Sequence, residues 1–230
     1  MIEFLQTYGI KVTPEQATLL DEHLRFVLAK NETLNLTSIT DYDRACALHV
    51  LDSLLVLPEL GVAPPGVLLD MGTGAGYPGL PLAVISKRAT VLLDAREKKI
   101  KALQEFLFSH TLPTPLLAVA ARAEEFAAEH REAYAVVTAR ALSALPSLLE
   151  LASPLLQKGG HLLALKAQLS EEERARAARL AEDTGLALIS RREYSLPSGE
   201  HREVAVYEKI SSAQIELPRR AGRAQHKPLA

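Results

Sequence analysis

Short apolar runs alternate with helix-period patterns from residue 67 to residue 210. The runs are continuously apolar and comprise Val67–Met71, Ala89–Asp94, Leu116–Ala120, Ala135–Ala139, His161–Lys166, Leu186–Arg191 and Val204–Lys209. A continuous apolar run indicates a strand buried on both faces, as in a parallel sheet covered by helices. Helical patterns fill most gaps, near Leu80–Ser86, Glu97–Ser109, Ala123–His130, Leu145–Leu156 and Glu171–Thr184. This alternation predicts an α/β fold with a doubly wound, mostly parallel, Rossmann-like sheet.

The last two predicted strands have no helix between them. The segment Leu196–Gly199, with its Pro and Gly, lies between the two runs, and this composition is typical of a turn. We therefore expect an antiparallel hairpin at one edge of the sheet.

The residues before this region have a helical pattern. Thr13 is followed by Pro14 and Gln16, which predicts a capping box at the start of a helix that continues to about Lys30. A polar segment, predicted to be a loop, leads to Asp41, which is expected to cap a second helix through Leu57. Prolines at 58, 64 and 65 and a glycine at 66 close this helical unit.

Three parts of the chain follow from these patterns and from charge. We expect an N-terminal helical extension over residues 1–60, a cofactor-binding α/β domain over 61–210, and a basic C-terminal tail over 211–230. The first part has four Lys or Arg and nine Asp or Glu, a net charge of −5, whereas the tail has a net charge of +3. The overall net charge is only −2. A basic end can contact phosphate, or it can be a solvated tail.

The composition limits the class of protein. A chain of 230 residues with 48% hydrophobic and 23% charged residues can build one large domain and is not disordered throughout. There is no Trp, so a broad aromatic platform for stacking bases is not expected. Cys46 is the single cysteine, and its apolar helical surroundings predict a buried packing residue. No segment approaches the about 18 apolar residues of a membrane span, and we expect a cytoplasmic protein that does not contact a membrane.

The most informative segment follows the first predicted strand. That strand ends at Asp70, and four glycines, at 72, 74, 76 and 79, follow within a few residues before a helical pattern begins. Glycine lets the backbone approach a ligand closely and adopt positive φ without strain. The segment therefore predicts a cradle for a nucleotide cofactor at the carboxyl ends of the strands.

Two kinds of cofactor compete for this cradle. Residues Gly74–Gly79 match GxGxxG, the dinucleotide fingerprint, but this match alone is weak. Asp70 at the strand end would repel a pyrophosphate, whereas it suits a ligand with an ammonium group. Asp94 ends the second strand, where a carboxylate can accept hydrogen bonds from ribose hydroxyls. Together with the predicted hairpin, these residues favour the methyltransferase version of the fold over an NAD-type oxidoreductase.

Several motifs around the glycine loop carry a more specific resemblance. They are Asn35-Leu36-Thr37, His49-Val50-Leu51-Asp52-Ser53-Leu54, Arg122-Ala123-Glu124, Thr138-Ala139-Arg140-Ala141 and Pro218-Arg219-Arg220-Ala221-Gly222. In this order the chain resembles, from about residue 31 to 229, the bacterial ribosomal RNA small-subunit methyltransferase G family. The resemblance implies a class I methyltransferase sheet and transfer of a methyl group from S-adenosyl-L-methionine to nitrogen-7 of a guanosine in 16S rRNA. The implied partner is 16S rRNA or the small ribosomal subunit, and we expect a monomer.

The resemblance and the residues together give a set of expected cofactor contacts. The family implies Gly72, Tyr77, Ala123, Glu124 and Arg140, and the pattern of the residues adds Asp70, Gly74, Gly76 and Asp94. Two positions depart from the family, because Tyr77 stands where Phe is usual and Ala167 stands where Gly is common. A non-catalytic RNA-binding assembly factor with the same fold is a further alternative. No metal site is expected.

The expected chemistry needs no catalytic base, because nitrogen-7 of guanine has a free lone pair and no proton. We therefore assign no catalytic residue. Arg140 is expected to orient the cofactor carboxylate or an RNA phosphate, with a structural ion pair as the alternative. His49, Asp52 and Ser53 share a helix face at spacings of three and four, and they are either packing residues or a wall of the site. We expect Arg219, Arg220, Arg223 and Lys227 of the tail to contact RNA.

Overall fold

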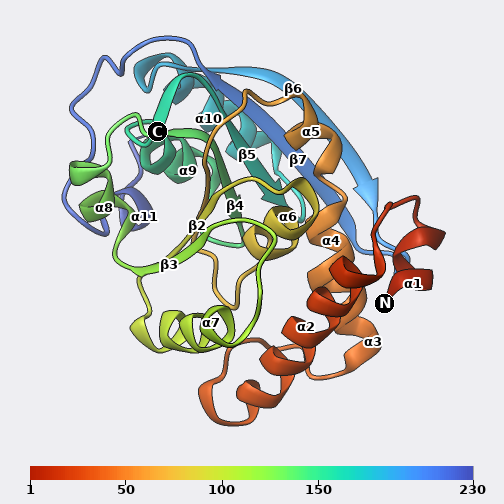
Figure 1. The fold of residues 1–230 in the computed structure, drawn as a ribbon. Helices are drawn as coiled ribbons and strands as arrows, with labels where there is room; N and C mark the ends of the chain where they lie inside the picture. Colours follow the sequence, from red (N-terminus) through yellow and green to blue (C-terminus); the bar gives the residue numbers. More distant parts are fainter. Residues whose placement is uncertain (230) are drawn as a thin grey trace.

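A seven-stranded sheet forms the centre of the computed structural model, which describes residues 1–229 (Figure 1). The strands are β1 (Leu68–Met71), β2 (Thr90–Asp94), β3 (Leu116–Ala120), β4 (Tyr134–Arg140), β5 (Leu156–Lys166), β6 (Leu186–Ser195) and β7 (His201–Lys209). Their order across the sheet is β3-β2-β1-β4-β5-β7-β6. The pairs among β1 to β5 are parallel, and β7 is antiparallel to both β5 and β6. The predicted doubly wound sheet with a C-terminal hairpin is confirmed.

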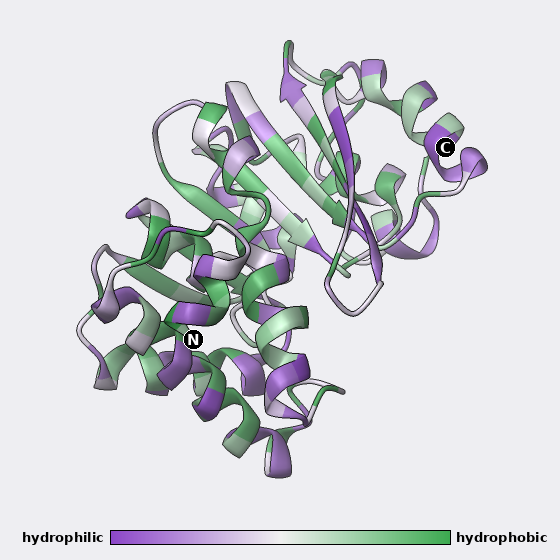
Figure 2. Cartoon of the chain, turned by 90° about the vertical axis from the view of Figure 1, so that its right-hand side faces the viewer, coloured by the Kyte–Doolittle hydropathy of each residue, from purple (hydrophilic) through white to green (hydrophobic). Residues whose placement is uncertain are grey.

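Helices cover both faces of the sheet. They are α1 (Ile2–Thr7), α2 (Pro14–Leu34), α3 (Tyr42–Ala45), the π-helix η1 (Cys46–Leu51), α4 (Asp52–Leu54), α5 (Leu57–Val62), α6 (Gly79–Ser86), α7 (Glu97–Ser109), α8 (Ala123–Glu129), α9 (Leu145–Ala152), α10 (Glu171–Asp183) and α11 (Arg223–His226). Leu69 and Val137 face the cluster with α8, α9 and α10, whereas Leu68 and Val136 face the opposite side. This alternation follows from the pleat of a strand. Hydrophobic residues dominate the central strands (Figure 2).

Most predicted elements lie within a few residues of their observed positions. The largest difference concerns β5, which begins at Leu156 and takes the end of the helix predicted over 145–156. Leu156 pairs with Tyr134 of β4, so the strand begins five residues before His161, where the apolar run starts. Gly159, with a φ of 77°, and Gly160 lie in this early part of β5. These glycines interrupt the apolar run, so the sequence pattern did not indicate a strand there.

The N-terminal helices differ from the sequence pattern in three ways. The capping box at Thr13 and Gln16 is present, and α2 then continues to Leu34, past the predicted end at Lys30. Asp41 caps the next helix as predicted, but this helix changes to π geometry over Cys46–Leu51. Pro58 does not end the unit; it lies in the first turn of α5, where a proline needs no N–H partner.

The stretch Tyr42–Val62 also corrects the expectation that no segment is apolar enough to span a membrane. Its most apolar 18-residue window has a mean hydropathy of 1.6, which length and composition alone would allow in a bilayer. In this protein, however, 67% of the most apolar window is buried inside the fold. The hydropathy of the stretch is accounted for by its packing against α2 and α6.

The N-terminal helices share a hydrophobic cluster with the α/β region. Leu20 and Leu24 of α2 lie in the same cluster as Leu80 of α6 and Phe106 of α7, and all four side chains are fully buried. Figure 1 shows this helical unit at one side of the sheet. The predicted boundary at residue 60 falls within α5, and the division into three parts stays a prediction.

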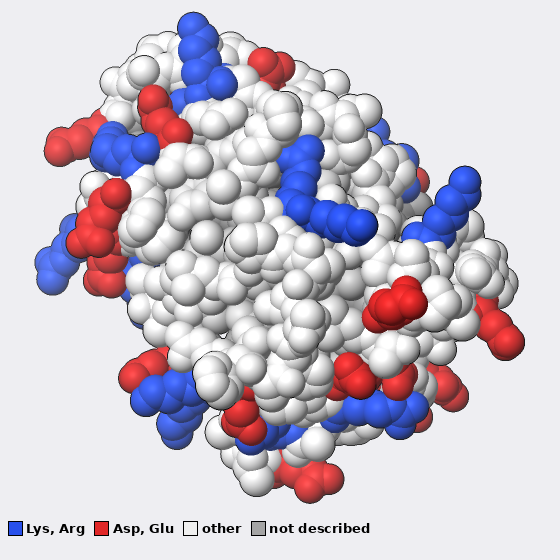
Figure 3. Space-filling model, in the orientation of Figure 1, with Lys and Arg blue, Asp and Glu red and all other residues white. Residues whose placement is uncertain are grey.

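Charges on the face shown in Figure 3 are scattered, with acidic and basic side chains interspersed. The tail is folded onto the α/β region, with Leu217 and Ala224 buried. Arg219 pairs with Glu150 of α9, its Nε lying 2.8 Å from Oε2. Arg219 therefore has a structural role, and its contact with RNA stays a prediction.

Candidate functional site

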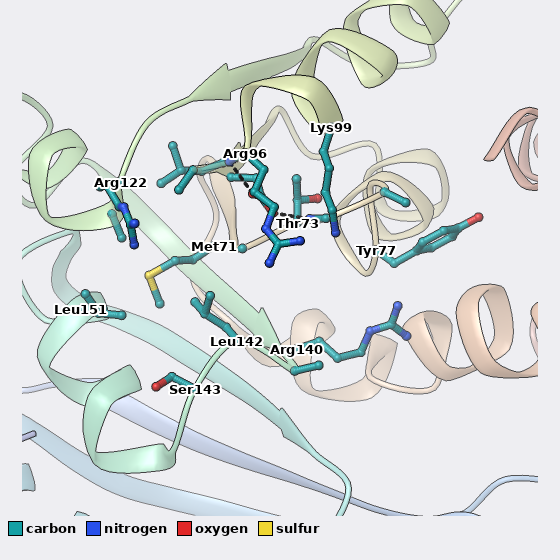
Figure 4. Close-up of a pocket in the computed structure, with 18 of the residues that line it drawn as sticks. Met71, Thr73, Tyr77, Arg96, Lys99, Arg122, Arg140, Leu142, Ser143 and Leu151 are labelled. Carbon is teal, nitrogen blue, oxygen red and sulfur yellow. Dashed lines mark hydrogen bonds between the residues drawn. The ribbon is translucent and has the colours of Figure 1, made fainter. Parts of the chain in front are cut away.

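A cavity of about 750 Å³ lies at the carboxyl ends of β1, β2, β3 and β4, where ligands of doubly wound folds bind. Most of the expected cofactor residues line it: Gly72, Gly74, Tyr77, Asp94, Ala123, Glu124 and Arg140. Figure 4 shows Arg96, Arg122 and Arg140 around the same space, each from a different turn or strand end. Asp70 and Gly76 are not among the lining residues.

Asp70 holds the glycine loop from beneath. Its carboxylate is fully buried, accepts a 2.8 Å hydrogen bond from the N–H of Gly79, and accepts a 2.9 Å bond from the hydroxyl of Thr138. Burial raises the pKa of this carboxyl above its usual value, and the hydrogen bonds from Gly79 and Thr138 oppose that shift. The side chain thus faces the loop backbone, not the cavity. The expectation that it receives an ammonium group of the ligand is not met by this geometry.

Asp94 fixes the outer edge of the same loop. One carboxylate oxygen accepts the N–H of Gly74 at 2.9 Å, and the other accepts the N–H of Arg96 at 2.8 Å. Because Asp94 also lines the cavity, its remaining lone pairs can accept hydrogen bonds from a ligand. The glycine loop is therefore held between two strand-end carboxylates, Asp70 below and Asp94 beside it.

Two glycines in the loop are required by close contacts. A Cβ on Gly72, whose φ is 77°, would lie 2.7 Å from a methyl carbon of Leu142. A Cβ on Gly76, whose φ is 99°, would lie 2.9 Å from Leu103 and 3.1 Å from the ring of His23. Gly76 therefore lets α2 and α7 pack against the loop. It acts through packing, not through a surface that faces the cavity.

Tyr77 forms the wall of the cavity next to the N-terminal helices. The His49 ring stacks on the Tyr77 ring with centroids 4.7 Å apart, and the guanidinium of Arg140 lies 5.7 Å from the centroid of the Tyr77 ring. His49 Nε2 lies 2.9 Å from the hydroxyl oxygen of Thr37. Burial, with a smaller contribution from the positive charge of Arg140, lowers the pKa of His49 to about 4. The imidazole is thus neutral at neutral pH.

Arg140 is held by the N-terminal helical unit. Its Nη1 donates to the carbonyl of Leu48 at 3.1 Å and to Oδ2 of Asp52 at 3.2 Å. The Asp52 side chain, only 4% exposed, also accepts from Nε of Arg202 on β7 at 3.1 and 3.2 Å. Arg140 and Arg202 share the single carboxylate of Asp52, so these three side chains together carry a net positive charge beside the cavity.

The residues singled out on the N-terminal helix have different roles. His49 lines the cavity, Asp52 holds Arg140, and Ser53 is buried and donates to the carbonyl of His49 at 2.5 Å. His49 lies in the π-helical segment, a geometry frequently found at functional sites. The helix therefore contributes both to the wall of the cavity, through His49, and to the packing of the fold, through Ser53.

The other end of the cavity is closed by the C-terminal tail. Glu124 is 8% exposed, and its Oε1 accepts the N–H of Gly222 at 2.7 Å. Gln225 and His226 of α11 line the same cavity. Ala123, at the start of α8, lies beside them in the lining.

Sequence reasoning missed several lining residues. Arg96 and Lys99 follow β2, and their place just after a strand end was a usable signal. Gln225 and His226 carried no signal, because only the folded tail brings them to the site. Within residues 1–229, no group of three or more His, Cys, Asp or Glu side chains is arranged to hold a metal ion.

Comparison with solved structures shows the fold. A complex of TYW2 from M. jannaschii with AdoMet superposes with a TM-score of 0.54 at 19% identity, covering 69% of this chain and 77% of that one. A SAM-dependent methyltransferase from Methanosarcina mazei gives a TM-score of 0.54 at 14% identity, covering 67% and 97%. The sheet is thus that of Rossmann-like methyltransferases.

Comparison with curated sequences covers nearly the whole chain. The ribosomal RNA small subunit methyltransferase G of Thermotoga petrophila is 37% identical over 226 residues, 98% of this chain and 96% of the relative. The protein of the same name from Deinococcus radiodurans is 38% identical over 225 residues, covering 96% and 88%. The family model described as rRNA small subunit methyltransferase G matches residues 16–194. The chain belongs to the rRNA small subunit methyltransferase G family.

Proposed function

We propose that this protein transfers a methyl group from S-adenosyl-L-methionine to nitrogen-7 of a guanosine in 16S rRNA. The observation that carries the proposal is the cavity at the carboxyl ends of the strands, in a chain of this family. It combines a glycine loop fixed by two carboxylates with a cation, Arg140, at the end nearest the N-terminal helices.

The residues of the cavity fit this cofactor. Met71, Leu142 and Leu151 lie toward one end and form an apolar wall suited to an adenine ring, and Arg140 and Tyr77 lie toward the other end (Figure 4). Asp94, which also lines the cavity, would accept hydrogen bonds from ribose hydroxyls. Arg140 would pair with the carboxylate of the methionine part.

The reaction depends on positioning more than on proton transfer. The bound cofactor supplies an electrophilic methyl group on a sulfonium. Nitrogen-7 attacks with its own lone pair, so the chain needs no general base. Holding the two partners in line can contribute up to about 7–11 kcal/mol in well oriented cases. His49 suits this wall because a neutral ring does not oppose the positive charge that develops on the guanine.

The target guanosine must be accessible. In A-form RNA the major groove, where nitrogen-7 lies, is too deep and narrow for a side chain to enter. The protein is therefore expected to act on an unpaired or splayed guanosine. The overall net charge of only −2 agrees with recognition by shape as well as by charge.

The decisive experiment is transfer of a radiolabelled methyl group to 16S rRNA and to 30S subunits that lack this modification. Reverse transcription after chemical cleavage at 7-methylguanosine should map a single site. Calorimetric titration should show binding of S-adenosyl-L-methionine and none of NAD. Binding of NAD would support the oxidoreductase alternative, and RNA binding without transfer would support the assembly factor.

We also propose that the protein acts as a cytoplasmic monomer with no membrane contact. The residues that line the cavity come from the strand ends, the N-terminal helices and the tail of the chain. The apolar stretch Tyr42–Val62 is largely covered by the fold. Light scattering after size-exclusion chromatography, with and without cofactor, tests the monomer; a stable dimer at micromolar concentration would contradict it.

A further inference from the structure

The C-terminal tail forms a smaller, open hollow on the surface beside the cofactor cavity. This basic hollow, of about 350 Å³, is lined only by tail residues, namely Arg220, Ala221, Gly222, Arg223, His226 and Lys227. Its side chains include three permanent cations. His226 lines both the basic hollow and the cofactor cavity, so the two spaces are adjacent.

Two buried carboxylates fix the backbone of the tail around the basic hollow. Glu124 accepts the N–H of Gly222 at 2.7 Å. Glu150, whose side chain is 1% exposed, accepts from Arg219 on one oxygen and from the N–H of Leu229, at 2.7 Å, on the other. Arg219 also donates to the carbonyl of Lys227 at 2.9 Å. The tail is therefore a built element, held on both sides of α11, and not a frayed end.

The cations of the basic hollow differ from two arginines of the C-terminal hairpin. On the hairpin, Arg192 pairs with Glu59 and Arg202 pairs with Asp52. Within residues 1–229, by contrast, Arg220, Arg223 and Lys227 have no acidic side chain within ion-pair distance. The fold thus neutralises Arg219 and leaves its three neighbours free to bind an anion.

We propose that the basic hollow binds a backbone phosphate of the RNA substrate. This inference rests on the proposed function and adds the place where the substrate backbone is held. Arginine guanidinium groups bind phosphate oxygens in a bidentate geometry, and a rigid backbone keeps them in place before the RNA arrives. The basic hollow adjoins the tail end of the cofactor cavity, which is the adenine end in the proposed binding mode, so the phosphate it binds lies along the strand from the target guanosine and not at the reacting nitrogen-7.

The structure also shows why removing the tail is a poor test. Truncation after Glu216 would delete Arg219 and leave the buried Glu150 carboxylate without its partner, which destabilises the fold. It would also remove Gln225 and His226 from the cofactor cavity. Point substitutions that spare the two anchors are therefore required.

The test uses the full chain with Arg220→Gln and Arg223→Gln combined. The matched control is Lys11→Gln with Lys158→Gln, which removes the same charge from exposed sites; Lys158 lies at the start of β5, away from the carboxyl ends of the strands. Affinity for 16S rRNA lacking the modification is measured between about 50 and 200 mM salt. Affinity for S-adenosyl-L-methionine and the thermal midpoint are measured in parallel.

The loss of one contact to a single-stranded phosphate lowers the slope of log affinity against log salt concentration by about 0.7. At about 0.1 M salt this change corresponds to about fivefold weaker binding of RNA, which we expect for the tail variant. Cofactor affinity, thermal midpoint and the control variant should be unchanged. Arg220→Lys with Arg223→Lys should restore the salt slope. An unchanged slope in the tail variant, or an equal loss in the control, would overturn the proposal.

A second outcome separates this inference from the proposed reaction. If the unaltered chain binds RNA through the tail but transfers no methyl group, the reaction is rejected and the basic hollow stands. If methyl transfer proceeds with normal RNA affinity in the tail variant, the reaction stands and the basic hollow is rejected.

Discussion

At the scale of single residues, Asp52 connects the cofactor cavity to the rest of the fold. It is buried, and it is shared by Arg140 at the cavity and Arg202 on β7. Removing either arginine leaves the carboxylate with one cation. The two changes therefore have a similar structural effect, and only one of them alters the cavity lining.

Arg140→Ala should weaken cofactor binding or turnover by about tenfold or more, because a hydrogen bond to a charged group contributes about 1.5–3 kcal/mol. Calorimetry and methyl-transfer kinetics measure the effect. Arg202→Ala is the matched control, since it also removes a partner of Asp52 but does not line the cavity. Equal losses of cofactor affinity in both variants would assign Arg140 a purely structural role.

His23 makes the stability of the protein depend on pH. It is fully buried between Tyr77 and Phe106, and burial lowers its pKa to about 3. As pH falls below the unfolded value of about 6.5, the unfolded chain takes up a proton that the folded chain does not, so stability is lost as pH falls. At pH 5 this loss is about 2 kcal/mol.

Urea unfolding at pH 7 and pH 5 checks this prediction. His23→Phe keeps an aromatic ring in the cluster and should lose less stability between the two pH values, by about 2 kcal/mol. His49, with a pKa of about 4, still contributes to the pH dependence in that variant. An identical pH dependence in the variant and the natural chain would exclude His23 as a source.

At the scale of elements, α2 supports the glycine loop from the side of the N-terminal unit. Its capping box is complete: the N–H of Gln16 donates to the hydroxyl of Thr13, and the N–H of Thr13 donates to the side chain of Gln16. The Gln16 amide also donates to the carbonyl of Val84 on α6, at 2.9 Å. The start of α2 is thus tied to the helix that follows the loop.

Thr13→Ala should lower the free energy of unfolding by about 1 kcal/mol, the usual value of an N-cap side chain. Thr18→Ala is the control, because Thr18 is an exposed residue within α2 and alanine is favoured there. Chemical denaturation measures both. A Thr13→Ala variant as stable as the natural chain would show that the cap contributes nothing.

Much of the sheet could be predicted from the sequence, because buried strands and covering helices leave continuous apolar runs and helical periods. The capping box at Thr13 and the hairpin at Leu196–Gly199 were also visible, since they depend on local residues. The π geometry of Cys46–Leu51 was not, because a π turn has no composition of its own. Within this segment the carbonyl of Leu48 accepts from Arg140, a tertiary contact that the local sequence does not show.

The site was predictable where it follows strand ends. Gly72, Gly74, Asp94 and Arg140 line the cavity, because the carboxyl ends of parallel strands meet at one edge. The position of Asp70 was predicted, but its direction was not: a strand end does not show which side of the loop a carboxylate takes. It contacts Gly79 and Thr138 beneath the loop.

At the scale of the whole molecule, the N-terminal helices and the α/β region form one hydrophobic core. Removing residues 1–60 would expose Leu80, Val84 and Phe106, which are fully buried. We expect the remaining chain to bind a hydrophobic dye and to lack a cooperative thermal transition. The complete protein should unfold in a single transition by calorimetry. Two separate transitions, or a folded truncated chain, would contradict this shared core.

The pairing of β1 with β4 has a consequence for how the protein folds. Leu68 lies beside Val136, so the centre of the sheet joins segments that are far apart along the chain. Contacts of this kind form slowly, since a long loop must close before they are made. The cofactor cavity spans this junction, with Gly72 on one side and Arg140 on the other. During refolding, cofactor binding should therefore appear only after β1 has paired with β4. The rate at which cofactor binding appears should then report the rate of this last pairing step.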